Sequence, residues 1–296
     1  MPCRAEHSWR APARFRFRVR RAPLFASFAR RFLCAAMGEE ALHSALGLCL
    51  LGAMVVSGAA LARGAVAPYG RYAGARSLSM AWGPRVPARI AWAFQELPSL
   101  LAPLLCVLAA DGPIGAPDAA LLAFFCAHYV NRAIVYPLRI RGGKATPAGV
   151  VAAAFAFTAA NGYLQGRALA PPSSWGRPAT RADARFLLGL AVAAAGACGN
   201  VWHDGVLRDL RRSGPPGRYG IPRGGLYEYV SGANFLCEIV EWGGFALAAR
   251  TPAACVFAAS CALNVGPRAV HHHRWYLATF GARYPAHRRA LVPFLL

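Results

Sequence analysis

The sequence is poor in acidic residues and has almost no lysine. Only 12 of its 296 residues are Asp or Glu, whereas 33 are basic, and Lys144 is the one lysine among them. Charged residues make up 15% of the chain and hydrophobic residues 56%, which is too little charge for a soluble domain of this length. A nucleic-acid-binding protein is disfavoured as well, since no soluble scaffold is available to cluster the basic residues.

Several motifs that mark cofactor and metal sites are also missing. None of the nine cysteines forms a C-x-x-C, and the triple histidine at 271–273 has no H-E-x-x-H beside it. We therefore expect buried thiols and no metal. No two glycines are spaced as G-x-G, which excludes a Rossmann fingerprint. Any nucleotide must bind in some other way.

Long apolar stretches dominate what is present. Several of them approach the roughly 20 residues that a helix needs to cross a bilayer, and turn-forming segments rich in Gly and Pro separate them. The stretches lie at about 41–62, 90–110, 119–138, 148–170, 184–203, 229–249 and 252–267. The sequence therefore predicts an all-α polytopic membrane protein with about seven transmembrane helices in the lipid bilayer, and with no separate soluble domain.

The basic residues alternate between the predicted loops. Of the 24 that follow position 36, we assign 19 to the first, third and fifth loops and the C-terminal tail, with Arg132 counted in the third loop. The positive-inside rule then predicts a cytosolic C-terminus and a lumenal N-terminus. Residues 1–36 hold nine arginines and break this pattern. We expect a dispensable extension there, with a transit-like presequence as the alternative, ahead of a membrane domain at 37–296.

Polar side chains recur inside the apolar stretches, where they are costly and by default mark function. Asn234, Glu238 and Glu241 are spaced i, i+4 and i+7, which is one face of a helix. The preceding apolar stretch has a polar face of its own, formed by Asn200, Asp204, Arg208 and Arg211. Three other stretches contain the polar residues Glu96, Tyr129, Asn131 and Asn161. Hydrogen bonding between helices is the alternative. Carboxylates from several spans favour a polar cavity, with basic residues near its mouth that suit phosphates.

Five segments resemble one known family. They are "RVPARIAWAFQELPSL", "FCAHYVNRAIVYPLRIRGGK", "NGYLQGRAL", "RYGIPRGGLYEYVSGANFLCEIVEWGGFALA" and "HHHRWYLATFGARYPAHRRALVPFLL". Together they resemble the steroid 5α-reductases, the 3-oxo-5α-steroid 4-dehydrogenases, and the likeness extends from about residue 60 to residue 296. It favours the branch of the type 1 and type 2 steroid enzymes.

The resemblance implies an activity, a location and a set of site residues. It implies NADPH-dependent reduction of the 4,5 double bond of a 3-oxo-4-ene steroid, within the endoplasmic reticulum membrane. Glu96 and Tyr129 match the pair at the steroid 3-keto oxygen. The positions that match the cofactor site are Tyr69, Trp92, Gln95, Tyr136, Lys144, Asn200, Asp204, Arg211, Asn234, Glu238, His272 and Tyr276. One departure is "NVWHD", where Trp202 stands in place of the family's histidine and His203 follows it.

The residue types suit this chemistry. Hydride attack on the β-carbon of an enone builds negative charge on the carbonyl oxygen, where preorganised donors lower the barrier. The Tyr129 hydroxyl is such a donor. Glu96 qualifies only when it is protonated, which burial among its sequence neighbours Trp92, Phe94 and Leu97 would favour.

Other interpretations stay open at this point. An enoyl-CoA or polyprenol reductase would keep the C-terminal cofactor half without needing Glu96 and Tyr129. A prenyl-cysteine methyltransferase-like enzyme would bind S-adenosylmethionine instead, and a helical membrane scaffold would bind no nucleotide. The sequence leaves the preferred steroid and the oligomeric state open, and a monomer is compatible with it.

Overall fold

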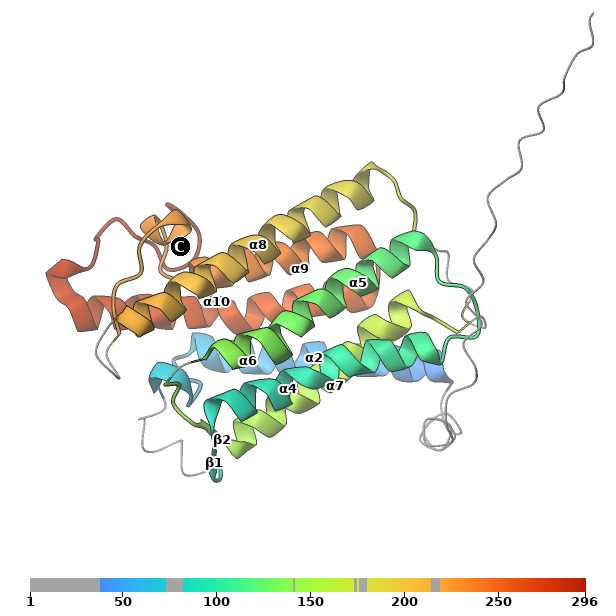
Figure 1. The fold of residues 1–296 in the computed structure, drawn as a ribbon, viewed down its shortest axis with the longest axis horizontal. Helices are drawn as coiled ribbons and strands as arrows, with labels where there is room; N and C mark the ends of the chain where they lie inside the picture. The colour runs from blue at the N-terminus through green and yellow to red at the C-terminus, as the bar shows by residue number, and fades with distance from the viewer. Residues whose placement is uncertain (1–37, 73–81, 141, 173–174, 176–179, 214–218) are drawn as a thin grey trace, which may run out of the picture.

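The computed structural model describes residues 38–72, 82–140, 142–172, 175, 180–213 and 219–296, so the predicted extension at 1–36 lies outside the described residues. Seven long helices form a bundle within these ranges (Figure 1). They are α2 (Glu39–Ala62), α4 (Ala88–Leu108), α5 (Ala116–Val130), α7 (Ala148–Leu169), α8 (Ala184–Ser213), α9 (Ala233–Ala249) and α10 (Pro252–Phe280). Each coincides with one of the seven apolar stretches, which confirms the all-α prediction.

Five of the described helices are long and apolar enough to cross a membrane: α2, α4, α8, α10 and the helix that runs from Ala116 to Arg139. The other two fall short for different reasons. Helix α9 has only 17 residues, and α7 buries Asn161, Gln165 and Arg167 in its second half. The chain is thus a polytopic membrane protein, while the predicted number of about seven spans and the direction in which the chain crosses the bilayer stay predictions.

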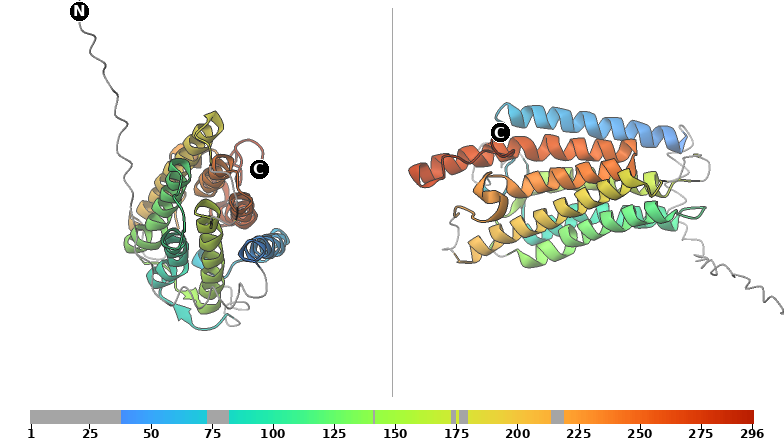
Figure 2. Two further views of the ribbon diagram at one scale, coloured as in Figure 1. Left: turned by 90° about the vertical axis from the view of Figure 1, so that its right-hand side faces the viewer. Right: turned by 90° about the horizontal axis from the view of Figure 1, so that it is seen from above.

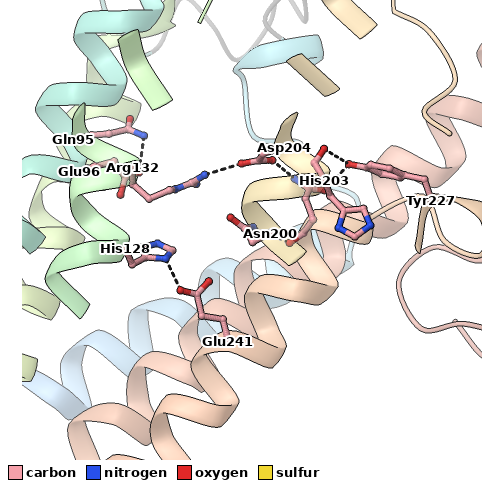
Figure 3. A network of polar contacts seen from close by, with 10 residues as sticks. Gln95, Glu96, His128, Arg132, Asn200, His203, Asp204, Tyr227 and Glu241 are labelled. Atoms are coloured by element: carbon pink, nitrogen blue, oxygen red, sulfur yellow. Dashed lines mark hydrogen bonds and ion pairs between the residues drawn. The ribbon is translucent and has the colours of Figure 1, made fainter. Parts of the chain in front are cut away.

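The third long helix changes its winding midway. Helix α5 continues through a π-helical turn, η2 (Asn131–Val135), into the short α6 (Tyr136–Arg139). Such π turns interrupt the regular helical register and are frequent at functional sites. This one carries Arg132, whose side chain turns toward α8 (Figure 3).

Glycines let neighbouring helices approach closely. A β-carbon on Gly196 of α8 would clash with the backbone nitrogen of Glu241 in α9, and one on Gly162 of α7 would lie 2.9 Å from the carbonyl oxygen of Pro98 in α4. Small residues at such contacts are the usual way in which membrane helices pack. They bring the polar faces of α8 and α9 together and hold α4 against α7.

An aromatic core lies between α5, α9 and α10. Phe125, Trp242, Phe245 and Phe257 are at most 4% exposed, and the rings of Trp242 and Phe257 are 4.3 Å apart. Large apolar side chains elsewhere point outward, among them Leu48 and Leu138, as expected for surfaces that contact lipid. Helix α2 lies along the outside of the bundle, beside α10 (Figure 2).

Short elements gather at one end of the bundle, which we call the loop-rich end (Figure 1). They are η1 (Gly70–Tyr72), the antiparallel strands β1 (Arg85–Val86) and β2 (Thr146–Pro147), η4 (Gly225–Glu228) and η5 (Gly281–Arg283). The C-terminal segment is fastened there, because the Ser231 N–H donates to the carbonyl oxygen of Arg289 at 2.8 Å. The buried Arg288 donates to the carbonyl oxygen of Pro222 and to the Glu228 carboxylate.

Candidate active site

The guanidinium of Arg132 lies at the centre of a polar network between four segments of the bundle (Figure 3). Its Nη1 donates to Asp204 Oδ2 of α8 at 3.2 Å, and the two side chains are only 13% and 9% exposed. Glu96 of α4 and Glu238 of α9 also act electrostatically on Arg132. A single buried cation thus serves three carboxyl groups from three different helices.

Aromatic rings hold this guanidinium from the other side. Its central carbon lies 4.9 Å from the ring centre of Trp92 and 5.3 Å from that of Tyr136, and the two rings contact each other at 5.1 Å. Arg208 lies 5.6 Å from the same Tyr136 ring. These are cation–π distances, and they bring Trp92 and Tyr136, both predicted site residues, next to Arg132.

The expected substrate pair, Glu96 and Tyr129, comes together beside Arg132. Tyr129 is 4% exposed, and the carboxyl groups of Glu96 and Glu238 act on its phenol. Ser99 of α4 also acts on this phenol, and the Ser99 hydroxyl donates to the carbonyl oxygen of Thr158 at 2.8 Å.

The surroundings that we expected for Glu96 are wrong in one respect. Phe94 and Leu97, its apolar sequence neighbours, are 53% and 37% exposed and point out of the bundle. Glu96 instead turns inward, where Gln95 Nε2 donates to its Oε1 at 3.3 Å and Arg132 lies nearby (Figure 3). Helical periodicity causes this difference, because residues adjacent in sequence point to different faces of a helix.

A chain of hydrogen bonds joins the polar faces of α8 and α9. Asn200 Nδ2 donates to the carbonyl oxygen of Asn234 at 2.9 Å, and Asn234 Nδ2 donates to Asp204 Oδ1 at 3.0 Å. The hydroxyl of Tyr227 completes the chain, since it lies 3.4 Å from Asn234 Oδ1. Burial raises the pKa of Tyr227 well above its usual range, and the Asp204 carboxylate acts in the same direction. Tyr227 therefore stays a donor at neutral pH.

Cations surround the predicted residue His272 on α10. Arg71, Arg268 and Arg211 all act on its imidazole, and so does His271. A group of positive charges with no carboxylate among these partners is suited to an anion.

The aromatic residues expected at this place are also present. Arg71 Nη2 donates to the hydroxyl of Tyr276 at 3.3 Å, and the Arg268 guanidinium lies 4.9 Å from the ring centre of Tyr69. Two buried polar atoms here, Arg71 Nη1 and the Tyr72 hydroxyl, have no hydrogen-bond partner within the described part of the chain. Burial raises the pKa of Tyr72 to about 12, so its hydroxyl keeps its proton at neutral pH. The Tyr72 hydroxyl and Arg71 Nη1 are therefore both available as hydrogen-bond donors.

Two predicted positions stand apart from these groups. Lys144 is exposed in the loop that leads to β2, and none of the contacts above includes it. In the "NVWHD" stretch, Trp202 is 50% exposed, whereas His203 is buried and connects α8 to η4. Its Nδ1 contacts the Gly199 carbonyl oxygen at 2.6 Å and its Nε2 accepts from the Leu226 N–H at 3.1 Å. The residue after Trp202 thus fastens the turn that carries Tyr227.

Sequence reasoning missed Arg132 and His128. Arg132 was counted as a loop cation, which is wrong, since it is buried within the helix that runs from Ala116 to Arg139. The available signal was its position three residues after Tyr129, inside an apolar stretch where a cation needs partners. His128 pairs with Glu241, whose Oε1 lies 2.6 Å from His128 Nδ1. Thus Glu241 has a different partner from Asn234, although both lie on the predicted polar face.

The fold and the site together define a class. The chain is a polytopic α-helical membrane protein that keeps buried carboxyl groups, a phenol and a cationic cluster within one bundle. The described residues contain no group of three or more His, Cys, Asp or Glu side chains able to hold a metal ion.

Comparison with known proteins narrows this class to a family. The profile described as 3-oxo-5-alpha-steroid 4-dehydrogenase matches residues 144–296. The chain is 44% identical to 3-oxo-5-alpha-steroid 4-dehydrogenase 1 of Bos taurus, over 77% of this chain and 88% of that protein. It is 46% identical to the Mus musculus type 1 enzyme, over 77% and 87%, and 44% identical to the Homo sapiens type 2 enzyme, over 71% and 82%. The chain belongs to the steroid 5α-reductase family.

Proposed function

We propose that this chain reduces the 4,5 double bond of 3-oxo-4-ene steroids, such as testosterone, with NADPH as the reductant. Membership of the family supports this activity. The observation that carries it is the meeting of Glu96 and Tyr129, from two different helices, beside the buried Arg132. By the same family relation and the positive-inside rule, we assign the protein to the endoplasmic reticulum membrane with its loop-rich end in the cytosol.

The cationic cluster fits the phosphates of a dinucleotide. Arg71, Arg211 and Arg268 gather around His272. The free donors on Arg71 and Tyr72 could donate hydrogen bonds to phosphate oxygens. Buried donors without partners are costly in an apolar bundle, so an anionic ligand would remove that cost. We assign Arg211, with Lys144 as a further candidate in its exposed loop, to the 2′-phosphate that distinguishes NADPH from NADH.

The hydrogen-bonded chain fits the nicotinamide end of the cofactor. Asn200, Asp204, Asn234 and Glu238 lie on α8 and α9, and they offer both donors and acceptors to an amide. When bound, NADPH supplies the hydride, while the protein supplies position, polarity and exclusion of water.

The substrate pair stabilises the charge that develops on the steroid oxygen. The Tyr129 hydroxyl would donate to the 3-keto oxygen. A protonated Glu96 would donate from the carboxyl oxygen that does not accept from Gln95. Both donors are held in place before the reaction, which makes such groups effective. An apolar steroid would reach them from the bilayer.

The test is steady-state turnover of testosterone by purified protein, with NADPH binding measured separately. Tyr129→Phe removes one hydroxyl at nearly constant volume, so kcat and kcat/KM should fall together by about 10²–10³-fold while NADPH affinity stays unchanged. Glu96→Gln keeps a donor and should retain more activity than Glu96→Ala. Tyr163→Phe is the matched control, since Tyr163 contacts Glu39 in a different part of the bundle.

The same assay separates the alternatives. Near-normal turnover in both Tyr129→Phe and Glu96→Ala would refute the assignment of the pair. If unmodified protein consumes NADPH only with an enoyl-CoA or a polyprenol, the substrate class is wrong. If it consumes none with any of these substrates, a non-enzymatic role gains support.

A further inference from the structure

A second buried acid–base pair lies next to Tyr129 on α5 and one helical turn from Glu238 on α9. Glu241 Oε1 of α9 is 2.6 Å from His128 Nδ1 of α5, and the two side chains are 0% and 7% exposed. Glu241 Oε2 has no hydrogen-bond partner among the described residues. The pair links α5, which carries Tyr129, to α9, which carries Asn234 and Glu238.

Both members of the pair touch residues of the proposed site. The His128 ring lies 5.1 Å from that of Tyr129 and 4.6 Å from that of Trp242, and Trp242 in turn stacks against Tyr129 at 6.3 Å. The Tyr129 ring is therefore packed against His128 and Trp242, and against Phe125 at 4.7 Å. On the other helix, both His128 and Glu241 act on the carboxyl group of Glu238, three residues before Glu241.

The stability of the bundle gives no reason for this pair. Burying an acid and a base costs desolvation, and apolar residues of similar volume are often at least as stable. The two helices already have an apolar contact, because Phe124 and Phe125 of α5 each pack against Phe245 of α9. A directional hydrogen bond adds what apolar packing lacks, namely a fixed rotation and depth of one helix against the other.

We propose that His128 and Glu241 are a positioning pair that sets the distance between the steroid and the nicotinamide. The pair fixes α5, which holds the ketone through Tyr129, against α9, which holds the nicotinamide end through Asn234 and Glu238. This role rests on the proposed function. Neither side chain takes part in a bond-making step, so its loss should slow hydride transfer while both ligands still bind.

The test compares variants that separate stability from positioning. Glu241→Leu and His128→Leu each leave one buried polar group alone and should lower the thermal stability. The double variant leaves neither group unpaired, so its stability should recover. Its kcat should nevertheless stay about 10–100-fold below that of the unmodified protein, since displacements of about 1 Å cost up to about 10²-fold. The KM for each ligand should be nearly unchanged, and the deuterium isotope effect on kcat, measured with NADPH deuterated at the transferred position, should rise.

Glu241→Gln is the conservative variant. The glutamine oxygen still accepts from an Nδ1–H, so this variant should keep kcat near the unmodified value. The matched control is the double variant Glu39→Leu with Arg167→Leu, which removes another buried ion pair, 2.6 Å long, between α2 and α7, and should leave kcat intact.

Two results would overturn the positioning role. One is a stable double variant, His128→Leu with Glu241→Leu, whose kcat equals that of the unmodified protein. The other is a stable Glu241→Gln variant as slow as Glu241→Leu, because charge and not the hydrogen bond would then matter. Failure of the proposed function itself is a different outcome, since the unmodified protein would then not reduce the steroid at all.

Discussion

Replacing Arg132 by methionine tests the organisation of the whole site. The methionine fills most of the volume of the arginine stem but removes the one cation that Glu96, Asp204 and Glu238 share. It also removes the contacts of the guanidinium with the rings of Trp92 and Tyr136. We expect loss of both stability and turnover.

The structure indicates how large this effect should be. Breaking a buried ion pair by removing one partner costs about 3–5 kcal/mol, and the Asp204 side chain is only 9% exposed. The loss is larger than for a surface pair, which contributes about 0–1 kcal/mol. Turnover should fall by about 10²-fold or more. Without their cation the three carboxyl groups shift, and displacements of about 1 Å within an active site cost up to about 10²-fold in rate. Arg132→Lys keeps the charge but loses the planar guanidinium. Its stability and turnover should therefore lie between those of Arg132→Met and those of the unmodified protein.

The assay is thermal stability of the solubilised protein together with turnover of testosterone. Arg139→Met is the control, because Arg139 lies on the same continuous helix, two turns onward, with an exposed side chain. It removes one cation without unpairing a buried carboxylate and should change neither quantity appreciably. If Arg132→Met had the same thermal stability and the same turnover as the unmodified protein, the central role of this guanidinium would be refuted.

Three further predictions follow from other parts of the chain. Arg211→Ala should raise the KM for NADPH about 10-fold or more, with less effect on NADH, since one charge-assisted contact contributes about 1.5–3 kcal/mol; equal rates with the two cofactors in the unmodified protein would contradict this. A protein that begins at Met37 should keep its activity and membrane insertion, and inactivity of an inserted protein would show a role for 1–36. The Gly224 N–H lowers the pKa of Glu228, and Arg288 acts in the same direction. The ionised Glu228 therefore stabilises the C-terminal segment at pH values above its ordinary pKa of 4.5. This stabilisation is lost as the pH falls through the pKa of Glu228 in the folded protein. Proteolysis of this segment should rise in acid, and Glu228→Gln should make it independent of pH over that range.

The sequence by itself determined the helices. Each apolar stretch became a helix because the bilayer leaves backbone groups no other partner than the helix itself. The polar face of Asn234 and Glu238, and that of Asn200 and Asp204, also followed from the sequence, because the helical period of 3.6 residues is a local property.

Only the tertiary structure decided which side chains from different helices meet. Hydropathy could not tell that the Arg132 side chain lies inside the bundle and the Arg139 side chain outside it, since both arginines belong to the same long apolar helix. The pairs Arg132–Asp204 and His128–Glu241 join residues distant in the chain. Such contacts depend on the depth and rotation of whole helices, which close packing at glycines such as Gly196 sets. Local periodicity predicts the face on which a residue lies, whereas the packing between helices determines which residue it contacts.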